Sequence, residues 1–208
     1  MSSSGPSSRH LLFGLFTAAI TWLALIVQWC ITSFGFIDFI SFFTIECNLL
    51  VALCLGFSLL FPQTAPGIFF SKTTVQTAIA LYIFIVALVY NTVLRGLYSF
   101  TGMQWVVDNL LHAVVPVLFI LYWYLFTSRI FLQWKECLYW LIFPLLYTLY
   151  SMIRGAFVHW YPYPFLNAEK LGYPKVFVNM LAVLAAFLIS RLILIAINRS
   201  VKNKSAAE

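Results

Sequence analysis

Six apolar runs, each long enough to span a bilayer, constrain this chain more than any other feature of its sequence. A transmembrane helix needs about 20 apolar residues, and the chain has such runs near 11–31, 39–61, 74–94, 106–126, 137–156 and 174–198. Lipid admits only helices and closed barrels, and barrel strands would alternate in polarity over about 10 residues, which these runs do not. The sequence therefore predicts an all-α polytopic membrane protein, a single bundle of six transmembrane helices.

The composition supports this class and argues against nucleic acid as a partner. Hydrophobic residues make up 63% of the 208 residues and charged residues only 9%, whereas a soluble domain carries roughly 25% charged residues. The net charge is +6, but most Lys and Arg residues lie at the ends of apolar runs and form no continuous basic stripe. This placement is typical of topology signals and of contacts with lipid headgroups. The expected partners are membrane lipids.

The loop charges predict the orientation. The side shared by both termini carries Arg9, Lys72, Arg129, Lys135, Arg199, Lys202 and Lys204. On the other side, basic residues are partly offset by acidic ones. Because positive loops stay in the cytoplasm, we expect both termini to be cytoplasmic.

The predicted organisation is a disordered Ser/Gly/Pro-rich tail at 1–10, a six-helix domain at 11–198 and a basic tail at 199–208. The first apolar run exceeds the roughly 7–15 residues of a signal-peptide core. We therefore interpret it as an uncleaved span, with a cleaved signal as the alternative.

The metal-ligating residue types are scattered. Cys30, Cys47, Cys54 and Cys137 lie within or beside apolar runs at no metal-like spacing, and the three histidines are far apart in the sequence. Such a distribution predicts neither a metal site nor another cofactor.

Polar residues in the second and fourth runs fall where separate helices can bring them together. Thr44 and Asn48 are four residues apart and share a helix face, as do Asp108 and His112. Thr44 lies about five and His112 about six residues into the predicted spans from the outer side, roughly 7–9 Å deep. Asp108 is placed to hold the His112 ring, and Asn109 offers an amide one turn away. The Asn48 amide can donate either to a neighbouring helix or to a reacting carbonyl oxygen. A hydroxyl beside an imidazole can be a nucleophile with its base, although each residue also has a structural interpretation.

Three further residues are candidates for substrate binding at the outer surface. Arg95 and Arg154 end the third and fifth runs, and Tyr163 belongs to the motif HWYPYPFLN. The arginines are either snorkelling anchors or ligands for a carboxylate, and the aromatic residues fit an interfacial belt as well. Glu46 and Asp108 are alternative counter-ions for the arginines.

The stretches FFTIECNLLVAL, DNLLHAVVPVLFILYW and RG…WYPYPFLN resemble a six-span membrane family. Its animal members, the androgen-induced proteins, hydrolyse fatty acid esters of hydroxy fatty acids, and this chain is more similar to the bacterial branch. In the animal enzymes a threonine in span two is the nucleophile and a histidine in span four is its base. The resemblance implies these roles for Thr44 and His112, a lipid-ester or fatty-acid substrate, and a bacterial inner membrane rather than an endomembrane.

The sequence thus favours a membrane-embedded threonine hydrolase and leaves two alternatives open. One is a non-catalytic protein or transporter that binds a lipid or small molecule at the same polar cluster. The other is a structural membrane protein whose polar residues only hold helices together.

Overall fold

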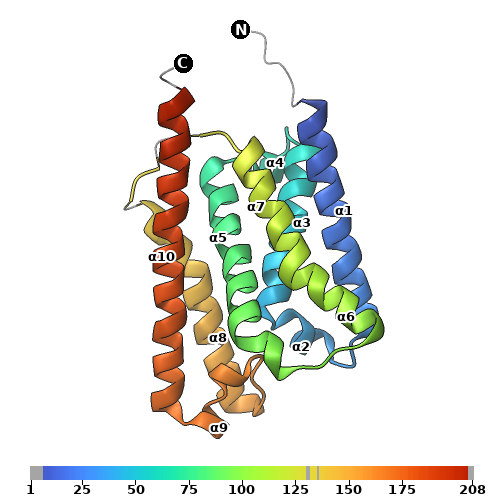
Figure 1. Ribbon diagram of the computed structural model, residues 1–208. Coiled ribbons are helices and arrows are strands. Elements are labelled where there is room, and N and C mark those ends of the chain that lie inside the picture. The colour runs from blue at the N-terminus through green and yellow to red at the C-terminus, as the bar shows by residue number, and fades with distance from the viewer. Residues whose placement is uncertain (1–6, 130–131, 135, 206–208) are drawn as a thin grey trace. The chain divides into compact units, whose positions relative to one another are not determined.

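The computed structural model describes residues 7–129, 132–134 and 136–205, and these residues are mainly helical, without a strand (Figure 1). Among the described residues, six helices are long and apolar enough to cross a membrane: Ser8–Ile31, Phe43–Leu60, Thr73–Leu97, Gly102–Phe126, Leu138–Val158 and Tyr173–Ser200. The prediction of an all-α protein with six spans is confirmed. The chain is a multi-pass integral membrane protein.

The α-helices in chain order are α1 (Ser8–Ile31), α2 (Phe36–Ile40), α3 (Phe43–Leu60), α4 (Ala65–Phe70), α5 (Thr73–Val89), α6 (Gly102–Asn109), α7 (Val115–Phe126), α8 (Ile142–Val158), α9 (Ala168–Leu171) and α10 (Tyr173–Ser205). Two π-helical segments, η1 (Tyr90–Leu94) and η3 (Leu110–Val114), interrupt the third and fourth spans. Short 3₁₀ segments complete the fold: η2 (Arg95–Leu97), η4 (Glu136–Leu141) and η5 (Pro164–Leu166).

The described residues divide into two compact units. Unit 1 contains the residues up to Ser33 together with Thr44–Ser128, and unit 2 contains Phe34–Phe43 together with the residues from Arg129 onward. The second and third predicted spans therefore belong with the first and fourth.

The two ends of the chain differ from the predicted tails. Helix α1 already begins at Ser8, because the Ser7 hydroxyl accepts a hydrogen bond from the His10 N–H at 3.3 Å and caps the helix. Residues 1–6 of the predicted tail lie outside the described residues. At the other end, α10 continues through the predicted basic tail to Ser205, and 206–208 lie outside the described residues.

Within unit 1, α7 packs against α1 and α5, and polar side chains join these helices. The indole N–H of Trp123 donates to the Thr77 hydroxyl at 2.9 Å, and the Thr127 hydroxyl donates to the Gln76 side chain at 2.8 Å. Such bonds between membrane helices stabilise the fold by only about 0.6 kcal/mol each. They fix the register of α5 against the end of α7.

The fourth span is interrupted at η3, immediately before Pro116. The N–H of Val115 donates to the carbonyl of Leu110, one residue further back than in an α-helix. Proline has no N–H, so the carbonyl of His112 loses its usual donor four residues on. Leu111 loses its donor too, since the N–H of Val115 is used by Leu110.

Two asparagines from other helices satisfy these carbonyls. Asn48 of α3 donates to the carbonyl of Leu111 at 3.2 Å, and Asn91 of η1 donates to the carbonyl of His112 at 3.1 Å. Neighbouring side chains commonly compensate for proline in membrane helices in this way. The turn that carries His112 is therefore hydrogen-bonded to the second and the third spans.

The second span begins later than predicted. The expected run 39–61 includes a break at Ser41 and Phe42, and α3 starts only at Phe43. The hydroxyl of Tyr147 stabilises the break, because it donates to the Ser41 carbonyl at 2.9 Å and accepts from the Phe43 N–H at 3.3 Å. The prediction that this span starts at 39 was wrong.

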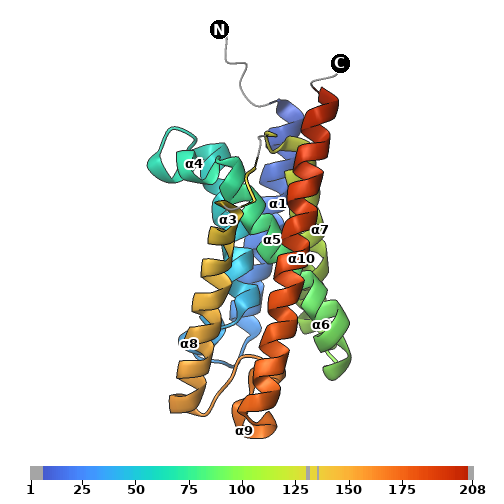
Figure 2. The ribbon, with the colours of Figure 1, turned by 90° about the vertical axis from the view of Figure 1, so that its left-hand side faces the viewer.

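At one end of unit 2, Arg154 forms an ion pair and a contact with an aromatic ring. Arg154 of α8 forms an ion pair with Asp38 of α2, and its guanidinium lies 4.7 Å from the ring centre of Trp160. Figure 2 shows α9 at the end where α10 begins, in agreement with the contacts that α10 makes with α9 and η5.

Gly155 of α8 allows Tyr161 to pack directly against the helix. A Cβ atom at this position would lie 2.1 Å from Cε1 of the buried Tyr161 ring, so the ring would have to move. We expect Gly155→Ala to destabilise the protein by about 1–3 kcal/mol and to lower its thermal unfolding temperature in detergent. Gly56→Ala is the matched control, since a Cβ there meets nothing within 4 Å. Equal unfolding temperatures for the two variants would contradict this account of the packing.

Candidate active site

Thr44 and His112 lie within hydrogen-bonding distance of each other in unit 1. Thr44 is in the first turn of α3, and His112 is the central residue of η3. Oγ1 of Thr44 and Nε2 of His112 are 3.2 Å apart, and the Thr44 side chain is buried. The sequence placed Thr44 about five and His112 about six residues into their spans, whereas Thr44 is the second residue of α3 and His112 is the eleventh residue of the span Gly102–Phe126. Nevertheless, the two residues that the sequence proposed as nucleophile and base are in contact.

Asp108 holds the other nitrogen of the imidazole. Nδ1 of His112 is 2.9 Å from the backbone carbonyl of Asp108 and 3.2 Å from its Oδ1 atom. Both atoms are hydrogen-bond acceptors, so Nδ1 must carry the proton in the neutral ring. Nε2 is then unprotonated, and it is the atom that faces the Thr44 hydroxyl. Asp108 therefore has the orienting position that the sequence predicted for it.

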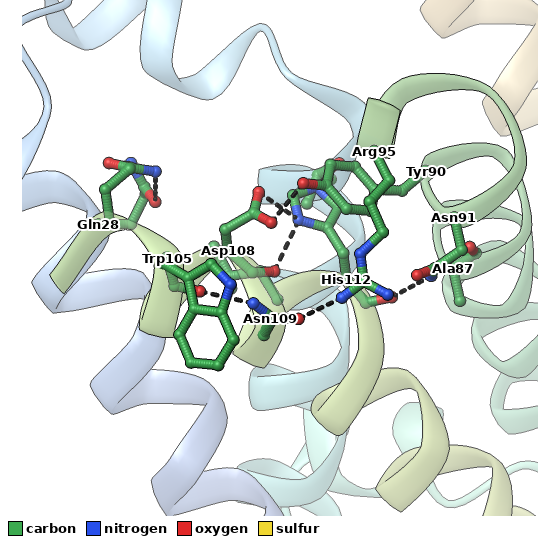
Figure 3. A network of polar contacts seen from close by, with 12 residues as sticks. Gln28, Ala87, Tyr90, Asn91, Arg95, Trp105, Asp108, Asn109 and His112 are labelled. Atoms are coloured by element: carbon green, nitrogen blue, oxygen red, sulfur yellow. Dashed lines mark hydrogen bonds and ion pairs between the residues drawn. The ribbon is translucent and has the colours of Figure 1, made fainter. Parts of the chain in front are cut away.

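Tyr90 completes the cluster, and reasoning from the sequence missed it. It is the first residue of η1, its ring stacks on the His112 imidazole with ring centres 3.7 Å apart, and its hydroxyl donates to Oδ2 of Asp108. Figure 3 shows Tyr90 and Asp108 around His112. In the sequence, Tyr90 lies near the end of the third apolar run, where interfacial tyrosines are common. Only the neighbouring Asn91 hinted at a polar environment.

Asn48 shares a face with Thr44, as predicted, but it has no free donor. Its Nδ2 atom donates to the Thr44 carbonyl at 2.8 Å and to the Leu111 carbonyl at 3.2 Å. Both amide hydrogens are used, so Asn48 is not available to bind a reacting carbonyl oxygen. It instead fixes the start of α3 against η3.

Asn109 is the last residue of α6, one turn before His112, and Arg95 is the first residue of η2. The guanidinium of Arg95 donates to Oδ1 of Asn109, whose Nδ2 donates to the Trp105 carbonyl at 2.8 Å. Arg95 is exposed, and its partner is a neutral amide (Figure 3). Among the described residues, no carboxylate forms a salt bridge with Arg95. Its charge is available to an anionic ligand.

Arg154 and Tyr163 belong to unit 2. Arg154 pairs with Asp38, so the suggestion that Glu46 or Asp108 is its counter-ion was wrong. Tyr163 stacks on Phe165 with ring centres 5.3 Å apart and meets Phe42 edge to face at 5.9 Å. This is the packing of an aromatic cluster. The structure thus brings together the predicted site residues of unit 1 and describes these two separately.

In the part of the chain that the structure describes, no three His, Cys, Asp or Glu side chains converge as metal ligands. No family model matches the chain, and comparisons with curated proteins and with solved structures give no significant match. Function is therefore inferred from the geometry of Thr44, His112, Asp108 and Tyr90.

Proposed function

We propose that the protein is a membrane-embedded hydrolase of lipid esters, with Thr44 as nucleophile and His112 as general base. One observation carries the proposal: Oγ1 of Thr44 lies 3.2 Å from Nε2 of a histidine whose other nitrogen is held by a carboxylate. A nucleophilic hydroxyl needs an adjacent base, and the base needs a third group that orients it. The buried positions of Thr44 and Asp108 support this interpretation, because polar side chains inside a membrane are costly unless they pair or function.

The chemistry follows from the observed contacts. Nε2 of His112 takes the hydroxyl proton as Oγ1 of Thr44 forms a bond to the ester carbonyl carbon. The ester C–O bond then breaks, and the imidazolium returns the proton to the departing alkoxide, which leaves as an alcohol. Water, deprotonated by His112, attacks the acyl–Thr44 ester and releases the fatty acid. The Thr44 hydroxyl recovers its proton in this step. Asp108 stabilises the positive imidazolium in both halves of the reaction.

The negative charge on the carbonyl oxygen needs hydrogen-bond donors. Because both amide hydrogens of Asn48 are used, we assign this role to backbone N–H groups near Thr44. A donor of this kind contributes about 2.7–4 kcal/mol to transition-state stabilisation in other enzymes.

The surroundings of the site favour a lipid substrate with an acidic group. The site lies in helices of membrane-spanning length, which an ester dissolved in the bilayer can reach. Arg95 would bind a carboxylate, as in a fatty acid ester of a hydroxy fatty acid. The resemblance of the Thr44 and His112 segments to the androgen-induced-protein family supports this substrate class. On the same resemblance, we propose the bacterial inner membrane as its location.

Labelling of the purified protein with a fluorophosphonate tests the proposal. We expect loss of fluoride, a covalent adduct on Thr44 in peptide mapping by mass spectrometry, and release of fatty acid from a lipid ester in nanodiscs. Neither adduct nor turnover, together with uptake of a lipid or small molecule into protein-loaded liposomes, would instead support the transporter alternative.

A further inference from the structure

Tyr90 contacts both members of the His112–Asp108 pair. Its ring lies 3.7 Å from the imidazole, centre to centre, with an angle of 15° between the planes. The Tyr90 side chain is buried, with 6% of its surface exposed. The imidazole therefore has a flat wall on one face, and this wall limits rotation of the ring about its Cβ–Cγ bond.

The hydroxyl of Tyr90 fixes the carboxylate. It donates to Oδ2 of Asp108, whereas Oδ1 of the same carboxylate lies 3.2 Å from Nδ1 of His112. Each oxygen thus has its own partner. Rotation of the carboxylate away from His112 would break the bond to Tyr90 and leave a buried acceptor unsatisfied, which is costly.

We propose that Tyr90 is a positioning residue. Through Asp108 and through its stacked ring, it keeps the proton on Nδ1 of His112 and leaves Nε2 free to accept the Thr44 proton. The inference rests on the proposed function, since Tyr90 has a catalytic role only if Thr44 and His112 hydrolyse esters. The placement of the proton on Nδ1 can be measured in the absence of any substrate.

Nitrogen NMR of ¹⁵N-histidine-labelled protein in nanodiscs measures this placement directly. The chain has three histidines, so the His112 signals can be assigned from His10→Gln and His159→Gln variants. In alkaline buffer, where histidine rings are neutral, we expect His112 of the native protein to show a protonated Nδ1 and an unprotonated Nε2. In Tyr90→Phe, which keeps the ring and removes the hydroxyl, the ratio of the two tautomers should shift by about threefold to tenfold toward Nε2–H.

Two further variants separate positioning from a general loss of structure. Tyr98→Phe makes the same chemical change at an exposed tyrosine that stacks on Phe100, and the tautomer ratio should not change. Asp108→Asn should shift the ratio in the same direction as Tyr90→Phe. In the Asp108→Asn background, Tyr90→Phe should have no additional effect, because the Tyr90 hydroxyl acts through the carboxylate.

The outcomes distinguish this inference from the proposed function. If lipid-ester hydrolysis is established, Tyr90→Phe should lower kcat about tenfold and leave KM unchanged. An unchanged tautomer ratio in Tyr90→Phe, or an equal shift in Tyr98→Phe, would overturn the inference even if Thr44 is labelled. A shifted ratio in a protein that neither labels nor hydrolyses esters would support the positioning role and refute the hydrolase.

Discussion

Thr44→Val is expected to lower ester hydrolysis on the order of 10⁴-fold or more, as loss of the nucleophile does in other enzymes, and to abolish fluorophosphonate labelling. Valine preserves the branched shape of the side chain in the first turn of α3 and removes only the hydroxyl that faces Nε2 of His112 at 3.2 Å. Initial rates in nanodiscs and peptide mapping by mass spectrometry measure the two effects.

Two variants control this result. Thr44→Ser keeps an oxygen within reach of His112 and should retain measurable turnover. Thr92→Val removes an exposed threonine hydroxyl that donates to the Leu88 carbonyl in the same span, and activity should not change. Full activity in Thr44→Val, with the protein folded, would falsify the hydrolase proposal.

His112→Gln is expected to lower kcat by about 10²–10⁴-fold, the usual contribution of a general base. Glutamine cannot take the Thr44 proton at neutral pH, although it can still form hydrogen bonds to Asp108. Binding of a non-hydrolysable ether analogue should persist, because the exposed guanidinium of Arg95 is unchanged.

His159→Gln is the matched control for His112→Gln. His159 lies in unit 2, is exposed, and its Nδ1 atom contacts Oε1 of Glu169. Its replacement should leave the labelling rate at Thr44 unchanged, whereas His112→Gln should slow it. Equal labelling rates in the two variants would remove His112 from the role of base.

The sequence predicted those features of the fold that depend on local composition. Six runs of apolar residues were sufficient for six spans because only helices of this length satisfy their backbone groups in lipid. The start of α3 was mispredicted for the opposite reason. The break at Ser41 is stabilised by the hydroxyl of Tyr147, which is 106 residues further along the chain, and no local pattern records such a bond.

The candidate site was predictable only in part, for the same reason. Thr44, Asn48, Asp108 and His112 were found from helical spacing, since residues four apart share a face. Spacing does not show which acceptors an amide group donates to. The prediction left the amide hydrogens of Asn48 available to other groups, whereas in the structure both donate to backbone carbonyls.

Tyr90 was missed because stacking between two helices depends on their rotation about their own axes. The apolar run 74–94, which contains Tyr90, leaves this rotation undetermined. The pairing of Arg154 with Asp38 was missed similarly, since several carboxylates were equally plausible partners in the sequence.

Unit 2 consists of two segments that are far apart in the sequence, and this has a consequence for biosynthesis. Asp38 emerges from the ribosome 116 residues before its partner Arg154, a delay of about 6–23 s at 5–20 residues per second. During this interval all of Thr44–Ser128, and with it every residue of the Thr44–His112 site, has been synthesised. The residues of the Thr44–His112 site can therefore come together before segment Phe34–Phe43 contacts the later helices of unit 2.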